Sequence, residues 1–186
     1  LISDAFAIDE GLSIIKKKER RKHHTWKHVW GEQKTLIDHH TELELLIASD
    51  LIDFQTLIRF RLFDDGLGFR YEIPELKDNS QYRIMDELTE FNLSEDSPSW
   101  WIPAYAYRRY EFLYAKSLIS EISRDTYSTL VENLNPPRIG PEAVQTPFTT
   151  QRSDGIAISI HEANLTNYSS MTLKADGTKN LECDLV

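Results

Sequence analysis

The sequence is poor in the residues that cross-link small proteins or hold metal clusters. Cys183 is the one cysteine among 186 residues, which excludes an internal disulfide framework and a zinc site built from several cysteines. No apolar run approaches the roughly 18 residues that a membrane-spanning helix needs. Neither a glycine-rich phosphate loop nor a Gly-x-Ser-x-Gly elbow occurs. The sequence therefore offers no self-contained nucleotide site or serine hydrolase site.

Positive charge is also in the minority. The chain has 21 lysines and arginines against 30 aspartates and glutamates, for a formal net charge of −9. This balance disfavours nucleic acid as a partner, because phosphate binding draws on clustered Lys and Arg. The exception is the basic run at 16–24, which could act as a phosphate-binding arm. We expect it instead to be a solvated loop or hairpin tip, since no recognition helix or full set of stacking aromatics accompanies it.

What the chain does contain is enough apolar material for a core. Hydrophobic residues make up 40% and aromatic residues 11%, which argues against disorder. We expect one domain over residues 1–186. The chain begins at Leu1 rather than Met and ends on the apolar pair Leu185-Val186. We therefore expect a fragment or a trimmed piece of a longer protein, with any targeting segment removed.

Apolar residues recur mostly with a period of two, which is typical of strands. Alternation is clearest over 54–62 and 67–73, on either side of Asp64-Asp65-Gly66. That tripeptide is a turn signal in which we expect glycine to supply a positive φ. The pattern predicts a hairpin of two amphipathic strands, ended by Pro74, which cannot donate to a ladder.

The rest of the chain predicts an all-β fold. Asp176-Gly177 reads as a second hairpin turn, 132–155 as a long irregular loop, and no segment shows a capped helical stripe. Short strands without intervening helices indicate an antiparallel β-sandwich. Further strands are expected at 42–48, 82–92, 105–114, 156–161, 168–174 and 178–186.

Glu162 is the candidate site residue that strand phase singles out. His161-Glu162 resembles the start of a zinc-protease motif, but the position of the second histidine is occupied by Leu165. Glu162 continues the phase of the isoleucines at 156, 158 and 160, so it would leave the strand on its apolar side. A carboxylate there needs a cation or good donors. Two interpretations stay open: the strand ends at Ile160 and Glu162 turns to water, or Glu162 is a ligand for a hard cation such as calcium.

Histidines and aromatic residues give weaker candidates. The pairs His23-His24 and His39-His40 suggest a metal, but neighbours on a strand point to opposite faces, so we expect solvated side chains. Eight rings could form a sugar-stacking platform, although aromatics at strand spacing more often belong to a core or an inter-domain contact. These are Trp26, Trp30, Trp100, Trp101, Tyr105, Tyr107, Tyr110 and Tyr114.

Six segments, taken together and in order, resemble the N-terminal domain of glycoside hydrolase family 97. Each segment alone is weak, but the set spans roughly residues 20 to 175 and is specific in combination. The segments are TWKHVWGE (25–32), FRLFDDGLGFRYE (60–72), ELTEFN (87–92), WWIP (100–103), YEFLY (110–114) and SIHEANL (159–165).

The resemblance implies an architecture and an activity. It implies an N-terminal β-super-sandwich of the galactose-mutarotase type, here expected to be incomplete at its C-terminal end. A catalytic (β/α)₈ barrel and a small C-terminal β-domain, both absent from this sequence, would follow it. Members are periplasmic or secreted enzymes that hydrolyse α-glucosides or α-galactosides with the help of Ca²⁺. Glu162 corresponds to the glutamate that this domain lends to the calcium ion.

The resemblance also sets limits on this chain. The catalytic carboxylates belong to the barrel, so no catalytic residue is expected here and the chain alone should be inert. Its expected partners are the barrel itself and, through the barrel, an oligosaccharide substrate, with no membrane span. The choice between glucoside and galactoside, and between inversion and retention, stays open. The alternative is a free-standing carbohydrate-binding β-sandwich module.

Overall fold

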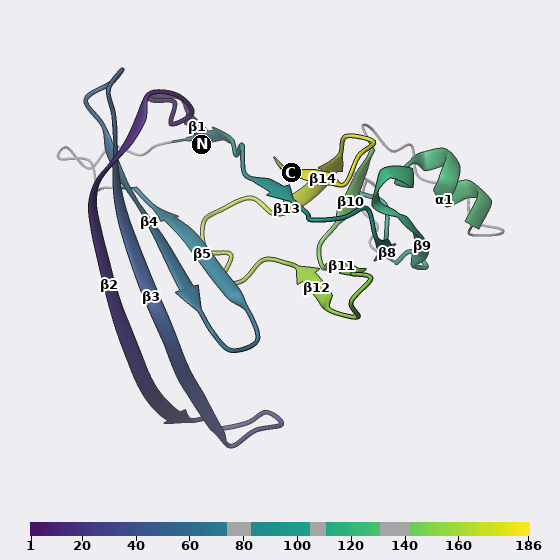
Figure 1. Ribbon diagram of the computed structural model, residues 1–186, viewed down its shortest axis with the longest axis horizontal. Helices are drawn as coiled ribbons and strands as arrows, with labels where there is room; N and C mark the ends of the chain where they lie inside the picture. Colours follow the sequence, from purple (N-terminus) through teal and green to yellow (C-terminus); the bar gives the residue numbers. More distant parts are fainter. Residues whose placement is uncertain (74–82, 105–110, 131–141) are drawn as a thin grey trace. The chain divides into compact units, whose positions relative to one another are not determined.

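The computed structural model describes residues 1–73, 83–104, 111–130 and 142–186. They form two compact units, one of Ile2–Arg83 and one of Ile84–Val186 together with Leu1 (Figure 1). Each unit is described by itself below. Strands dominate both, so the prediction of an all-β sandwich is confirmed, and the assignment of 1–186 to one domain stays a prediction. No described helix is long and apolar enough to cross a bilayer.

The first unit is built on one four-stranded antiparallel sheet with the order β2-β3-β4-β5. Two long strands pair from Leu12↔Ser49 to Lys27↔Thr35, with a bulge near Ile14. β4 pairs with β3 only as far as Thr41, so the far ends of β2 and β3 form a two-stranded ribbon (Figure 1). The strands of this unit are β1 (Ile2–Ser3), β2 (Leu12–Lys27), β3 (Thr35–Ser49), β4 (Gln55–Leu62) and β5 (Leu67–Glu72).

The predicted hairpin at 54–73 is confirmed as β4 and β5. The register runs from Leu57↔Glu72 to Leu62↔Leu67, and Phe60 lies opposite Phe69 on the apolar face. The expectation about its glycine is wrong, because Gly66 lies outside the positive-φ region. The turn closes instead through a backbone bond from Phe63 N to Gly66 O at 2.8 Å.

The basic run at 16–24 is not a loop or a hairpin tip, because it lies inside β2. Its alternate residues face acidic or polar partners across the ladder: Lys18 pairs with Glu44 and Arg20 with Glu42. Opposite charges on directly paired strand positions are favourable. Local sequence could not reveal this, since the neutralising residues lie more than 20 positions away.

The second unit is a small sandwich of two antiparallel sheets. One has the order β10-β13-β14-β7 and the other β12-β11-β8-β9, and a bridge between Pro103 and Val144 links them. Both sheets contribute buried side chains to one core, among them Trp101, Phe148 and Leu173. The strands are β6 (Ile84–Asp86), β7 (Glu90–Asn92), β8 (Pro98–Trp101), β9 (Ala115–Leu118), β10 (Ala143–Gln145), β11 (Phe148–Gln151), β12 (Ala157–Ile160), β13 (Met171–Ala175) and β14 (Asn180–Leu185).

Several sequence expectations are confirmed or corrected in this unit. β12, β13 and β14 confirm the strands expected near 156–186, and Gly177 supplies the turn with φ of 79°. The strand expected at 82–92 is two short strands. The described part of the loop expected at 132–155 contains β10 and β11, and the described part of the strand expected at 105–114 is irregular. Residues 105–110 and 131–141 lie outside the described residues.

The expectation of no helix is also wrong. A 3₁₀ turn, η1 (Ile119–Glu121), precedes a short helix, α1 (Arg124–Leu130). Ser123 caps α1, since its Oγ accepts a bond from Thr126 N at 3.0 Å. Tyr127 is fully buried in the core and donates its hydroxyl to Leu113 O. A seven-residue helix fixed by one cap and one buried ring is too short to give a periodic signal.

Candidate metal-binding carboxylate

Glu162 follows directly after the end of β12. The strand ends at Ile160, which lies opposite Phe148 of β11 and is 8% exposed. Ile158 is half-buried, whereas Ile156 precedes the strand and is 53% exposed. The predicted apolar phase therefore holds only for the last two isoleucines. Glu162 itself is half-buried, so it neither continues the strand nor turns fully to water.

Neutral donors hold the carboxylate of Glu162. Its Oε1 accepts a hydrogen bond from the backbone N of Met171, at the start of β13, at 2.6 Å. Its Oε2 accepts a longer bond from Thr146 Oγ1 at 3.4 Å. Among the described residues, no lysine, arginine or histidine forms an ion pair with this carboxylate. The negative charge is oriented by the fold but not neutralised by it.

Among the described residues, this arrangement leaves part of the acceptor capacity of Glu162 unused. An ionised carboxylate offers about four lone-pair sites, and the two bonds to Glu162 occupy two of them. Calcium binds six to eight oxygen ligands, and carboxylates are its preferred charged ligands. Across the described ranges, no group of three or more His, Cys, Asp or Glu side chains is arranged to hold a metal. The described His, Cys, Asp and Glu side chains alone would therefore not complete a calcium site around Glu162.

The surroundings of Glu162 carry further negative charge. Glu87 is 8% exposed, and its carboxylate accepts bonds from Tyr168 Oη at 2.6 Å and from Thr89 Oγ1 at 2.8 Å. Burial, reinforced by the charges of Glu87 and Glu162, raises the pKa of the Cys183 thiol to about 12. The thiol is therefore neutral and unreactive at physiological pH. Two nearby carboxylates that disfavour a third negative charge would also favour a bound cation.

Glu42, on the sheet of the first unit, is a carboxylate of the opposite kind. Its side chain is 0% exposed, although it lies on a sheet face and not in an apolar core. Three guanidinium groups and an ammonium group cover it. These are Arg20 (2.6 Å), Arg59 (2.9 Å), Arg61 (3.0 Å) and Lys22 (3.7 Å).

These cations fully neutralise Glu42. Burial alone would raise the pKa of Glu42, but hydrogen bonds from Arg20 and Arg61, helped by the charge of Arg59, lower it to about 2. Arg59 also forms a two-pronged pair with Glu72, at 2.6 and 2.9 Å, and binds Glu44. This network leaves Glu42 no free capacity for a metal ion, so we assign it a structural role.

The histidine pairs are only partly solvated. His23, His24 and His39 are exposed as expected, but His40 is 5% exposed, which corrects that expectation. His40 Nδ1 lies 2.5 Å from Asp38 Oδ1, and the ring tilts against Phe63. The chain neighbours do face opposite sides of the sheet, because the ladder pairs His23 with His39 and Lys22 with His40.

The described aromatic residues do not form one continuous platform. Trp101 is 1% exposed and donates its ring N–H to Ser117 Oγ at 3.0 Å, so it belongs to the core. Its neighbour Trp100 lies on the other face of β8, beneath Lys116 Nζ at 4.7 Å from the ring centre. Trp30 is 84% exposed in the turn between β2 and β3. The tyrosines at 105, 107 and 110 lie outside the described residues.

Comparison with known proteins agrees with the resemblance seen in the sequence. The chain matches the family described as Glycosyl-hydrolase 97 N-terminal over residues 3–185, and it belongs to that family. A Glycoside Hydrolase Family 97 enzyme from Pseudoalteromonas sp. strain K8, solved in complex with acarbose, is 32% identical with a TM-score of 0.75. The match covers 94% of this chain and 24% of that chain. A variant of the same enzyme in complex with panose gives the same values.

A more distant structure shows the same fold. A beta-arabinopyranosidase matches with a TM-score of 0.80 over 97% of this chain and 28% of its own, at 14% identity. At that identity the likeness concerns the fold alone. The chain thus spans about a quarter of the length of the solved relatives that it matches.

Proposed function

We propose that this chain is the N-terminal part of a calcium-dependent α-glycoside hydrolase of the α-glucosidase type, in which it packs on the catalytic barrel and contributes Glu162 as one calcium ligand. One observation carries the proposal. Glu162 is a half-buried carboxylate that the fold orients through Met171 and Thr146, and no basic side chain of the described residues pairs with it. The relatives in complex with acarbose and panose support an α-glucoside as the substrate. We also propose a periplasmic or extracellular location, which is what the resemblance implies.

Neighbouring residues of this chain would position Glu162 as the calcium ligand. The Met171 N–H fixes the carboxylate at the entry to β13, and β12 fixes the main chain just before it. A ligand held in this way has little conformational freedom to lose when it binds an ion. When bound, the calcium ion would polarise a substrate or water oxygen and hold the surrounding carboxylates in place.

The reaction itself needs residues outside this chain. Glycosidic cleavage uses two carboxylates that flank the scissile bond, and their separation decides between inversion and retention. We assign neither carboxylate to the chain, and we expect the 186-residue chain alone to be catalytically inert. The match of 94% of the chain to 24% of a longer Glycoside Hydrolase Family 97 enzyme supports this accessory role over a free-standing carbohydrate-binding module.

The test is the substitution Glu162→Gln in the full-length protein. The amide keeps the side-chain shape but removes the charge, so calcium affinity and α-glucosidase activity should fall together. A substitution in the second shell of a metal site typically costs 10–100-fold, so losing the ligand itself should weaken calcium at least about tenfold. Calcium titration by calorimetry and initial rates at several calcium concentrations measure both effects.

Glu95→Gln is a matched control. The carboxylate of Glu95 is also held by a backbone N–H and a hydroxyl, both from Ser153, at 2.8 and 2.9 Å. Arg152, 3.7 Å away, already balances its charge, so calcium affinity should not change. Wild-type calcium affinity and activity in the Glu162 variant would contradict the proposal. Equal losses in both variants would point to a general structural effect and would contradict it as well.

A further inference from the structure

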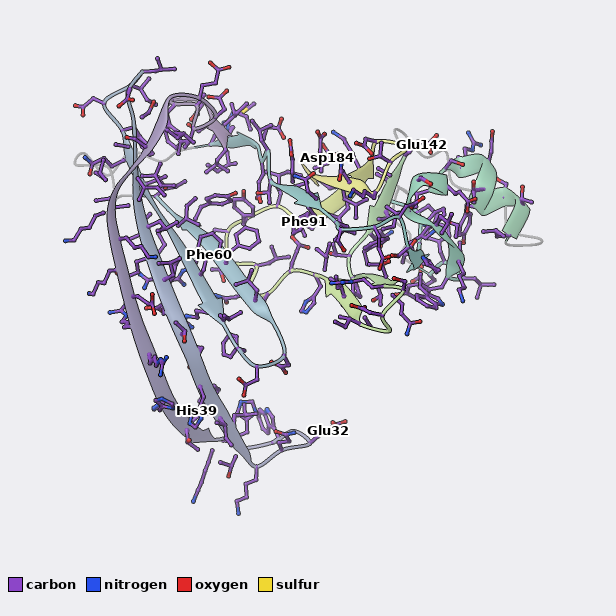
Figure 2. All side chains as sticks on the ribbon, viewed as in Figure 1. Glu32, His39, Phe60, Phe91, Glu142 and Asp184 are labelled. Atoms are coloured by element: carbon purple, nitrogen blue, oxygen red, sulfur yellow. The ribbon has the colours of Figure 1, made fainter. Side chains whose placement is uncertain are left out.

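Two histidines that are far apart in the sequence are cross-strand neighbours on the first sheet. His23 of β2 lies directly opposite His39 of β3, and both side chains are exposed. Their ring centres are 4.6 Å apart, with an angle of 72° between the ring planes. His39 lies near the far end of β3, beyond the last residue that β4 covers (Figure 2). Neighbouring histidines along one strand point apart, whereas this pair shares one face.

The distance between the ring centres is compatible with a two-histidine chelate. An imidazole nitrogen binds a borderline metal ion at about 2.0–2.1 Å. Two imidazoles on adjacent corners of one ion then have ring centres about 4.5 Å apart for a 90° angle, and about 5.2 Å apart for a tetrahedral angle. The observed distance of 4.6 Å is close to the value for a 90° angle at the metal. Angles of 90° between neighbouring ligands are typical of the square-planar or tetragonal coordination of Ni²⁺ and Cu²⁺.

We propose that His23 and His39 form a bidentate surface site for a transition-metal ion of the Ni²⁺ or Cu²⁺ type, with water completing the coordination. On the same face, β2 places Arg21 and Thr25 beside His23, and β3 places Ile37 beside His39. None of these three supplies an oxygen carboxylate, so a hard ion such as calcium finds no suitable ligand set here. The site is chemically distinct from Glu162 and independent of the function proposed for that residue.

Metal binding would cross-link the two-stranded ribbon formed by the far ends of β2 and β3. Within the described part of the chain, residues 22–27 and 35–40 pair only with each other, and a two-stranded ribbon is marginally stable in water. A cross-link between its strands should suppress local opening, since binding to the closed form shifts the equilibrium towards it. Amide exchange in this ribbon should therefore slow when the ion is bound.

The test uses full-length protein without a polyhistidine tag, titrated with Ni²⁺ by calorimetry and followed by amide exchange. His23→Asn and His39→Asn should each weaken Ni²⁺ at least about tenfold and abolish the protection of the ribbon. The matched control is His24→Asn, because His24 is also exposed and is adjacent in sequence but lies on the opposite face, paired with Asp38. It should bind Ni²⁺ as the wild type does, and Ca²⁺ should protect the ribbon in none of the variants.

Three results would overturn the proposal. The first is an absence of Ni²⁺ binding by the wild-type protein. The second is binding that His24→Asn abolishes and His23→Asn leaves intact, which would place the ion on the other face. The third is binding that slows exchange throughout the sheet in all variants, which would show that the ion acts away from this pair.

Discussion

The sheet around Glu42 and the strand ends around Glu162 both shield a carboxylate from water, but they treat its charge differently. Glu42 is covered by Arg20, Arg59 and Arg61, and its pKa falls to about 2. Glu162 meets a backbone N–H and a hydroxyl, with no basic side chain paired to it among the described residues. Basic side chains balance the charge of Glu42, whereas the described part of the chain pairs no basic side chain with Glu162.

The difference is the reason for assigning Glu42 a structural role and for proposing Glu162 as a metal ligand. A buried carboxylate that is already paired gains little from a metal ion, and losing its partners is costly. A carboxylate held by neutral donors keeps its negative charge available, and its fixed orientation lowers the entropic cost of binding. Burial alone would have selected Glu42 as the candidate site, whereas the partners of each carboxylate select Glu162.

Acidification should produce the largest change in stability, and it should destabilise the sheet around Glu42. The folded-state pKa values of Glu42 and Glu72, both about 2, lie below the usual 4.5. Their contribution to stability is therefore complete above about pH 4.5 and is lost as the pH falls towards 2. Amides of β2–β5 should lose exchange protection across that window.

The expected control for acidification is internal to the molecule. The core around Trp101, Phe148 and Leu173 is apolar. The described carboxylates of this unit whose pKa is lowered, Glu95 and Asp176, are held mainly by the backbone and hydroxyl donors of Ser153 and Thr178 and not by a buried guanidinium network. The amides of this core should keep their protection to lower pH than those of the β2–β5 sheet. A simultaneous loss of protection in both regions at one pH would contradict the contrast between them.

Glu42→Gln should give the next largest effect, as a loss of stability without a loss of calcium binding. The amide leaves Arg59 and its neighbours facing each other without the central charge. Breaking a fully buried ion pair costs about 3–5 kcal/mol, but Arg20 and Arg61 reach water here, so we expect about 1–3 kcal/mol. Denaturant unfolding measures the free energy, and calorimetry measures the affinity for calcium.

The control for Glu42→Gln is Glu19→Gln on β2. Glu19 is exposed and lies on the opposite face, paired with Leu43, so its substitution should change the free energy of unfolding by less than about 0.5 kcal/mol. Equal destabilisation by both variants would show that the ion-pair network around Glu42 contributes no more to the free energy of unfolding than an exposed carboxylate does. A fall in calcium affinity in Glu42→Gln alone would move the ligand assignment away from Glu162.

Local patterns predicted much of the fold but not the charge pairing. Alternation predicted the β4–β5 hairpin, because the apolar residues of each strand, including Phe60 and Phe69, recur at every second position and so mark one face. The basic run was misread because Glu42 and Glu44, which neutralise it, are remote in sequence. The helix α1 was missed because Tyr127 and the Ser123 cap fix only seven residues.

The sequence identified the candidate residue of the site but not the groups that hold it. The phase of Ile158 and Ile160 drew attention to Glu162, and the resemblance gave it a role. The sequence could not show that Met171 N would hold the carboxylate, because a backbone donor leaves no mark on residue identity. Likewise, the sequence alone could not show that His23 lies opposite His39, because this depends on the register between β2 and β3.

A structure of the full-length protein grown with calcium tests the central claim most directly. The account predicts a calcium ion with a Glu162 carboxylate oxygen among its ligands, at about 2.3–2.6 Å. It also predicts that Met171 N still donates to that carboxylate and that Glu42 remains among its arginines. A fully coordinated calcium ion with no ligand from Glu162 would contradict the account.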